Sequence, residues 1–144
     1  MTPSVTTGSR DPLTAEIIAA AIHVHRRLGP GLLESVYEGC LTFELAKRHI
    51  VVQQQVPVPV VYEGNRIELG FRIDLIVANS VIVEVKAVEA VHPIVDAQVL
   101  TYLKLTGLHT ALVCNFNVGL MKDGGQAIGS LSVVSRHRLR TRAC

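Results

Sequence analysis

The chain has 144 residues, of which 49% are apolar, so it can bury one sizeable hydrophobic core and is not a long disordered protein. Its 14 lysine and arginine residues and 12 aspartate and glutamate residues give a net charge of +2, which is too small to indicate nucleic-acid binding by itself. Aromatic residues are scarce and tryptophan is absent, so valine, isoleucine and leucine must form the core, which suits an α/β fold.

Residues 1–12 are polar and rich in threonine, serine and glycine, and we expect them to form a flexible N-terminal arm. They lack the apolar stretch of a signal peptide, and no run in the chain approaches the roughly 20 apolar residues of a membrane helix. The three cysteines are far apart and without metal-ligand spacing, which indicates reduced thiols rather than a zinc site. We therefore expect a cytoplasmic protein without membrane contact, whose single domain covers residues 13–135.

Two helices are predicted first. Thr14 is a suitable N-cap for a helix that continues to about residue 28, with apolar residues at helical spacing. Gly29, Pro30 and Gly31 end it. A second helix is predicted over residues 33–48, with one apolar stripe along it. The members of that stripe are Leu33, Val36, Tyr37, Cys40, Leu41 and Leu45.

Extended chain follows from residue 50. Two prolines alternate with valines over residues 56–60, which predicts an edge or irregular strand at this end. Turn residues at 63–65 and 78–80 predict strands over 66–77 and 81–87 that form a hairpin. Pro93 and Gly107 delimit a third helix, and the apolar segment 110–116 predicts a buried strand. After a loop at 122–125, residues 127–135 could add an edge strand.

The predicted order is therefore α-α-β-β-β-α-β, with one further strand. Three consecutive strands, a crossover helix and another strand form a mixed central β-sheet flanked by α-helices. The fold class is α/β.

The candidate functional residues lie on the predicted hairpin. If Asn79 is its midpoint, Val77 pairs with Val81, and Asp74 lies directly opposite Glu84. Two opposed carboxylates on one face destabilise a hairpin unless a cation lies between them. This pattern predicts a site for Mg²⁺ or Mn²⁺, which prefer oxygen ligands.

Two neighbours would complete this site. The carbonyl of Val85 would face the same region if the strand bends. Lys86 shares the face of Glu84, because side chains alternate along a strand, and it could act on a water molecule or a phosphate. The alternative interpretation is an ordinary salt bridge between Lys86 and one of the two acids. The residues alone leave both interpretations open.

Three further residues are weaker candidates. Glu34 lies in the first turn of the second helix, where a carboxylate also stabilises the helix dipole without any other role. Gln98 and Tyr102 are four residues apart on the third helix and share one face, where they could bind a phosphate or form an ordinary polar border.

Other motifs give little support for a function. Arginines alternate in the predicted basic tail at residues 136–144, where they could contact phosphates or remain solvated. The glycine-rich nucleotide loops and the serine-hydrolase elbow are absent from the sequence.

Several segments together resemble a known family. Residues 31–37, Gly-Leu-Leu-Glu-Ser-Val-Tyr, match the signature of the GxxExxY family. Further segments follow in order: Gln-Val-Pro at 55–57, Gly-Phe-Arg-Ile-Asp-Leu at 70–75, Val-Glu-Val-Lys-Ala at 83–87, Ala-Gln-Val-Leu-Thr-Tyr-Leu-Lys at 97–104 and Asn-Phe-Asn at 115–117. The resemblance covers roughly residues 13–134. That family is similar to the PD-(D/E)XK nuclease superfamily. The restriction-endonuclease-like core of that superfamily is a helix, three strands, a helix and another strand, and the element order predicted above contains it.

The resemblance implies roles for the candidate residues. Asp74 and Glu84 correspond to the two metal-binding acids and Lys86 to the lysine of the superfamily. Glu34 corresponds to a helix glutamate that assists the metal. Gln98 and Tyr102 are similar to the Gln-x-x-x-Tyr element of RecB-like nucleases.

The chain departs from the pattern at two positions. Ile73 occupies the position of the proline in the superfamily name, and Val95 occupies a position where close relatives would have histidine.

The resemblance predicts a metal-dependent nuclease that hydrolyses phosphodiester bonds, and a homodimer is compatible with it. It does not determine the substrate, for which we expect DNA rather than RNA. The rival prediction is a catalytically inactive module of this fold that binds nucleic acid or a protein partner.

Overall fold

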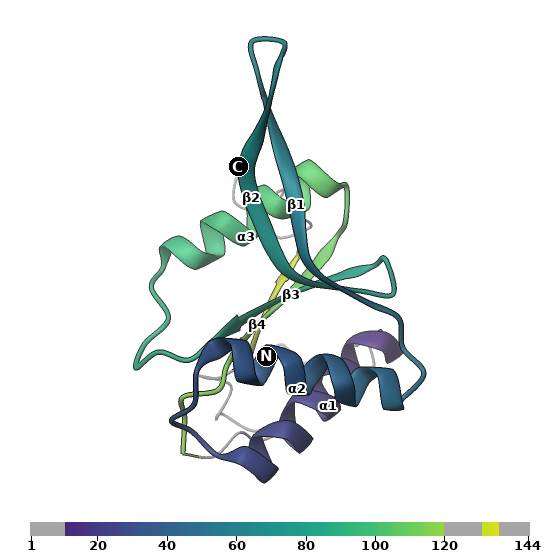
Figure 1. Ribbon diagram of the computed structural model, residues 1–144, viewed down its shortest axis with the longest axis vertical. Helices are drawn as coiled ribbons and strands as arrows, with labels where there is room; N and C mark the ends of the chain where they lie inside the picture. Colours follow the sequence, from purple (N-terminus) through teal and green to yellow (C-terminus); the bar gives the residue numbers. More distant parts are fainter. Residues whose placement is uncertain (1–10, 120–130, 136–144) are drawn as a thin grey trace, which may run out of the picture.

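The structure, a computed structural model, describes residues 11–119 and 131–135 (Figure 1). Its elements are, in chain order, α1 (Pro12–Leu28), α2 (Glu34–Lys47), β1 (Val52–Tyr62), β2 (Asn65–Val77), β3 (Val81–Lys86), α3 (Ile94–Thr106), β4 (Thr110–Asn115) and β5 (Leu131–Ser135). The predicted element order is confirmed.

The described strands form one mixed sheet in the order β1-β2-β3-β4-β5. β3 and β4 are parallel, whereas the other neighbouring strands are antiparallel. The proline-containing strand β1 lies at one edge, as predicted, because proline cannot donate to a second neighbouring strand. The predicted last strand is present from Leu131 at the other edge, and residues 127–130 lie outside the described part.

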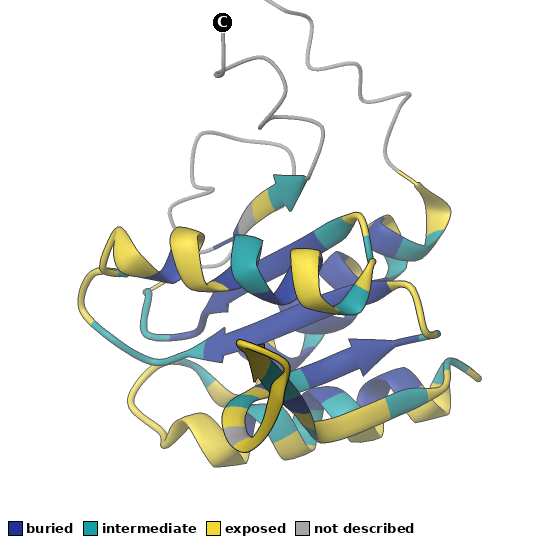
Figure 2. Cartoon of the chain, turned by 90° about the horizontal axis from the view of Figure 1, so that it is seen from above, coloured by how far each residue is buried: buried dark blue, intermediate teal, exposed yellow. Residues whose placement is uncertain are grey.

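Helices cover both faces of this sheet (Figures 1 and 2). One hydrophobic cluster joins α1 and α2 to one face, and a second cluster joins α3 to the other. The central strands are buried on both sides, while the outward surfaces of the helices are exposed (Figure 2). β3 is consequently apolar except for Glu84 and Lys86, and these two polar residues in a buried strand require an explanation.

The first helix begins earlier than predicted. It starts at Pro12, and the side chain of its N-cap Asp11 accepts a hydrogen bond from the backbone N–H of Leu13, 3.4 Å away. Proline suits the first helical turn because that position needs no backbone donor. The prediction of Thr14 as N-cap was wrong, since Thr14 is buried inside the helix. Pro12 therefore belongs to the helix, and Asp11 is its N-cap.

Turn chemistry explains the hairpins and the third helix. Glu63 and Gly64 both have positive φ, as the tight turn between two twisted antiparallel strands requires. The predicted pairing of Val77 with Val81 is confirmed across the next turn. Gly107 ends α3 in the left-handed conformation, with φ 77°, as predicted.

The loop between α1 and α2 is fixed by a single buried residue. The Tyr37 hydroxyl donates a hydrogen bond to the carbonyl of Gly29 (2.5 Å) and accepts one from the N–H of Leu32 (3.1 Å). Its ring stacks on Phe116 of the segment after β4, with ring centroids 4.6 Å apart. The same loop contains Gly31 at φ 101°, a conformation that favours glycine. This loop sets where α2 begins, and thus the position of Glu34.

The predicted apolar stripe on α2 is narrower in the structure. Tyr37, Leu41 and Leu45 are fully buried, but Leu33 is 74% exposed. Leu33 is the N-cap residue, just before the helix turns toward the core, so its side chain does not reach the sheet.

Replacing Tyr37 by phenylalanine tests this loop anchor. We expect the free energy of unfolding to fall by about 1–2 kcal/mol, because the hydroxyl bonds to Gly29 and Leu32 are lost. Denaturant unfolding measures the change. Tyr62→Phe is the control, since Tyr62 is 65% exposed, and an equal loss in both variants would contradict the anchoring role.

Candidate active site

The hairpin of β2 and β3 stops being regular where the two acids lie. Cα pairing is regular through Leu75 and Val83, and Asp74 and Glu84 come next. The Asp74 N–H donates to Oε1 of Glu84 (3.2 Å), and the Val85 N–H donates to Oδ2 of Asp74 (2.9 Å). The two acids are therefore interlocked through backbone hydrogen bonds. They are close together, as predicted, but they do not stand as a simple opposed pair.

A kink shared by β1 and β2 directs the Asp74 side chain. In β2, Leu75 packs in the cluster under α1 and α2, whereas Ile73, two residues away, packs in the cluster under α3. Residues two apart on a regular strand share a face. In β1, Val52 packs against the cluster under α1 and α2, whereas Val56 packs against the cluster under α3. Gln55, which lies between them, has a φ of 50°. The kink thus lets Asp74 point toward α2.

Asp74 lines a cavity of about 210 Å³ between α2 and the sheet. It is lined by Glu34, Ser35, Glu38, Gln55, Asp74 and Val85. Oε1 of Glu34 accepts a hydrogen bond from the Ala87 N–H (3.2 Å), so this glutamate reaches the end of β3. The structure therefore brings the predicted Glu34, Asp74 and Val85 together.

The Val85 backbone also faces this region. Its N–H points toward β2, where it bonds Asp74. The N–H and C=O groups of one strand residue point to the same side, so the Val85 carbonyl faces β2 as well. Lys86, the next residue, directs its carbonyl to the other side, where it accepts from the N–H of Phe116 (2.8 Å).

Burial and charge shift the acidity of Glu84. Glu84 is only 6% exposed. Its pKa is raised to about 8, mainly by burial and next by the negative charge of Asp74. The hydrogen bond from the Asp74 backbone and the charge of Lys86 act in the opposite direction. At neutral pH without a bound cation, Glu84 therefore holds a proton, and a cation that binds both acids would displace it.

Lys86 is half-buried, and its charge acts on Glu84. Within residues 11–119 and 131–135, no ion pair within 4 Å joins it to either acid, so the salt-bridge interpretation is not supported. The buried side chain of Asn115 fixes the chain beyond Lys86. It accepts from the Val88 N–H (3.1 Å) and donates to the Val88 carbonyl (2.9 Å).

The two residues on α3 differ in position. Tyr102 is 7% exposed and packs edge-on against Phe71, with ring centroids 5.3 Å apart. Burial raises its pKa, and the charges of Glu84 and Asp74 add to the shift, so its hydroxyl lies within electrostatic reach of both acids. Gln98 is exposed one turn earlier, and among the described residues it forms no hydrogen bond with either acid.

Sequence reasoning missed three residues of the cavity, Ser35, Glu38 and Gln55. Burial raises the pKa of Glu38, and the charge of Asp74 raises it further, against the hydrogen bonds from Gln55 and Gln54. The four-residue spacing of Glu34 and Glu38 could have indicated that both face the cavity. Nothing in a regular strand pattern would have pointed to Gln55.

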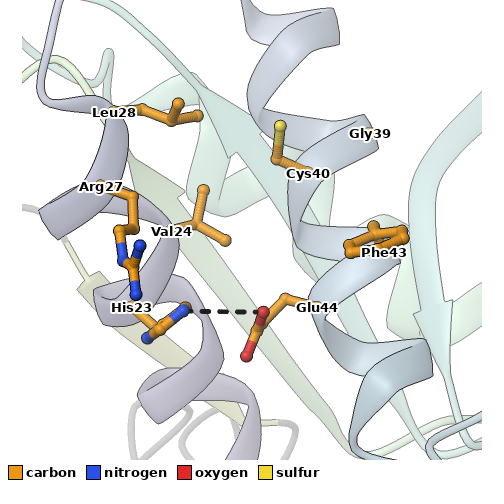
Figure 3. A pocket seen from close by; sticks show the side chains of 8 residues that line it. All are labelled: His23, Val24, Arg27, Leu28, Gly39, Cys40, Phe43 and Glu44. Carbon is orange, nitrogen blue, oxygen red and sulfur yellow. Dashed lines mark ion pairs between the residues drawn. The ribbon is translucent and has the colours of Figure 1, made fainter.

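Other sequence features lie elsewhere. Val95, at the position expected to be histidine in close relatives, is buried in the cluster under α3. A larger cavity of about 250 Å³ lies between α1 and α2, and it is mostly apolar apart from His23, Arg27 and Glu44 (Figure 3). Its walls include Phe43 and Cys40, on the other flank of α2 from the acids. The arginines of the basic tail lie outside the described residues.

The described residues, 11–119 and 131–135, contain no preformed metal site made of three or more histidine, cysteine, aspartate or glutamate side chains. Mg²⁺, however, needs only one or two protein carboxylates, since it keeps several waters. The interlocked Asp74 and Glu84 provide two carboxylates and the negative charge that a cation would balance, so this donor set fits a hard divalent ion.

A further negative finding concerns membranes. No helix in the described part of the chain is long and apolar enough to span one.

Comparison with known proteins gives one match. No curated protein and no solved structure matches the chain. The family model described as the PD-(D/E)XK nuclease superfamily matches residues 11–128, which is most of the chain. This range contains α1 to β4, both acids and Lys86. The chain therefore belongs to the PD-(D/E)XK nuclease superfamily, with the α/β fold of restriction-endonuclease-like proteins.

Proposed function

We propose that the protein is a nuclease that hydrolyses phosphodiester bonds of nucleic acid with the help of Mg²⁺ or Mn²⁺. One observation supports this most: the buried Glu84 and the half-buried Asp74 are interlocked by backbone hydrogen bonds, and burial together with the charge of Asp74 raises the pKa of Glu84 to about 8. Both acids can be ionised together at neutral pH only when a cation balances their charge, which is what a metal site requires. The superfamily membership makes nucleic acid the expected substrate.

Each residue has a proposed role. Asp74 and Glu84 hold the cation, and the Val85 carbonyl and Glu34 add oxygen ligands directly or through water. A bound divalent cation would activate water and stabilise charge on a phosphate. Lys86 orients the attacking water and neutralises charge that develops on the phosphate. Tyr102, whose pKa is raised by burial and by the charges of both acids, steadies the lysine or the phosphate, and Gln98 would join it on the substrate side.

Binding of Mn²⁺ tests this proposal directly. Calorimetric titration of the full chain should show binding, and Asp74→Asn should abolish it, because the amide removes one of two anionic ligands. Asp96→Asn is a matched control, since Asp96 is exposed on α3. Absence of Mn²⁺ binding to the unaltered protein, with retained binding of nucleic acid or a protein partner, would favour the inactive-module alternative.

Finer assignments are part of the same proposal. We propose membership of the GxxExxY family on the basis of Gly31, Glu34 and Tyr37, whose places in the fold give that spacing a purpose: a tight turn, a cavity ligand and a loop anchor. DNA rather than RNA as substrate, a cytoplasmic location and a homodimer stay predictions. Cleavage assays with matched DNA and RNA, and light scattering, would test the first and last.

A further inference from the structure

The amide of Gln55 lies between two acids of the cavity. Its Nε2 donates to Oε1 of Glu38 at 2.7 Å and to Oδ1 of Asp74 at 3.2 Å. A glutamine amide has two N–H donors, and this geometry directs one to each carboxylate. The side chain therefore joins α2 to the kinked part of β2.

The backbone of Gln55 supports this arrangement. Neighbouring residues on a regular strand point to opposite faces. Gln54 and Gln55 nevertheless both donate to Glu38, the former at 3.4 Å. The positive φ of Gln55 makes this possible, because it turns the side chain from its regular direction toward α2. A conformation that non-glycine residues rarely adopt is here combined with a specific pair of hydrogen bonds.

Gln55 also completes the fixation of Asp74. The Val85 N–H holds Oδ2 of this carboxylate, and the Gln55 amide holds Oδ1. Each carboxylate oxygen has a second lone pair that a cation can use. Groups that hydrogen-bond to a metal-binding carboxylate orient it and commonly change metal affinity by 10–100-fold when they are removed.

We propose that Gln55 is a positioning residue that holds Asp74, and Glu38 beside it, in the geometry that a divalent cation requires. This inference rests on the proposed function, since it needs a metal at Asp74. Gln55 does not touch the reacting atoms, so its removal changes how much metal is needed and leaves the maximal rate largely intact.

The experiment is a calorimetric Mn²⁺ titration of the full chain and of three variants. For Gln55→Ala we expect the dissociation constant to rise by about 10–100-fold. Gln55→Gly should give the same loss, although glycine adopts positive φ freely, so backbone strain is separated from the lost amide. Gln53→Ala is the matched control on the same strand, where the residue is also exposed, and it should bind as the unaltered protein does.

A second measurement separates positioning from a structural role. The cleavage rate of Gln55→Gly should recover to within a few-fold of the unaltered rate at saturating Mn²⁺, with only the metal concentration for half-maximal rate increased. Unchanged Mn²⁺ affinity in both Gln55 variants would overturn the inference and leave the proposed function standing. If the unaltered protein binds no Mn²⁺, the proposed function fails and this inference falls with it.

Discussion

Replacing Lys86 by alanine is expected to lower the rate of Mn²⁺-dependent DNA cleavage by at least about 100-fold, the size of effect typical for a group that orients or relays a proton in the reaction. Lys86 lies at the end of β3, half-buried, where its charge acts on Glu84. Alanine removes the ammonium group and keeps the strand. Cleavage of a labelled duplex under single-turnover conditions measures the loss.

Two controls make this result interpretable. Lys104→Ala removes an exposed lysine on α3 and should leave the rate within about twofold, because surface substitutions rarely matter. Thermal unfolding of the Lys86→Ala protein should remain within a few degrees of the unaltered protein. A folded Lys86→Ala protein that cleaves at the full rate would refute the role assigned to this residue.

Raising the pH is expected to destabilise the metal-free protein strongly. The pKa of Glu84 is about 8 in the folded chain and 4.5 as its ordinary value, so the folded state binds its proton more tightly than the unfolded state. The resulting stability is fully present below pH 4.5 and is lost as the pH rises through 8. Since one pKa unit corresponds to about 1.4 kcal/mol, the loss is on the order of a few kcal/mol.

Metal should reverse this effect. A divalent cation held by the two acids would displace the proton of Glu84, so the stabilisation by added Mn²⁺ should be larger at pH 8 than at pH 5. Denaturant unfolding at several pH values, with Mn²⁺ or with a chelator, measures both trends. In Glu84→Gln the side chain no longer titrates, and the metal-free pH dependence between 5 and 8 should largely disappear. A pH dependence that persists in that variant would show that another group causes it.

The salt-bridge network around Glu44 acts in a different pH range. Burial alone would raise the pKa of Glu44, but the Arg48 hydrogen bond and the charges of His23, Lys47 and Arg48 outweigh it and lower the pKa. Its contribution is present above pH 4.5 and is lost as the pH falls further. The pH range in which the protein loses the stabilisation by Glu44 therefore lies below the range in which it loses the stabilisation by protonated Glu84.

Much of the fold could be predicted because proline and glycine have strong local consequences. Pro57 and Pro59 placed β1 at an edge, and Pro93 and Gly107 delimited α3, since each residue restricts the backbone directly. Thr14 failed as a cap for the same reason: Asp11 and Pro12 form a stronger start signal just before it.

The site could be predicted only in part. Asp74 and Glu84 came from assuming a regular hairpin, and the register is regular up to Leu75 and Val83. The cavity beyond it depends on the kink at Gln55. There, the side chains of both β1 and β2 switch from one hydrophobic cluster to the other. The prediction relied on strict alternation of side chains along each strand, and the kink interrupts that alternation. The contributions of Glu38 and Gln55 to the cavity were therefore not predicted.

The Asn115 side chain also has a consequence for how the chain can move. Its hydrogen bonds to the N–H and carbonyl of Val88 join the loop after β3 to β4. The N–H of Phe116 also donates a hydrogen bond to the carbonyl of Lys86. The backbone that carries Lys86 is thus anchored on both sides of the residue. In the proposed reaction we therefore expect the ammonium group to reach a phosphate by rotation of its four-carbon side chain, with the main chain kept in place.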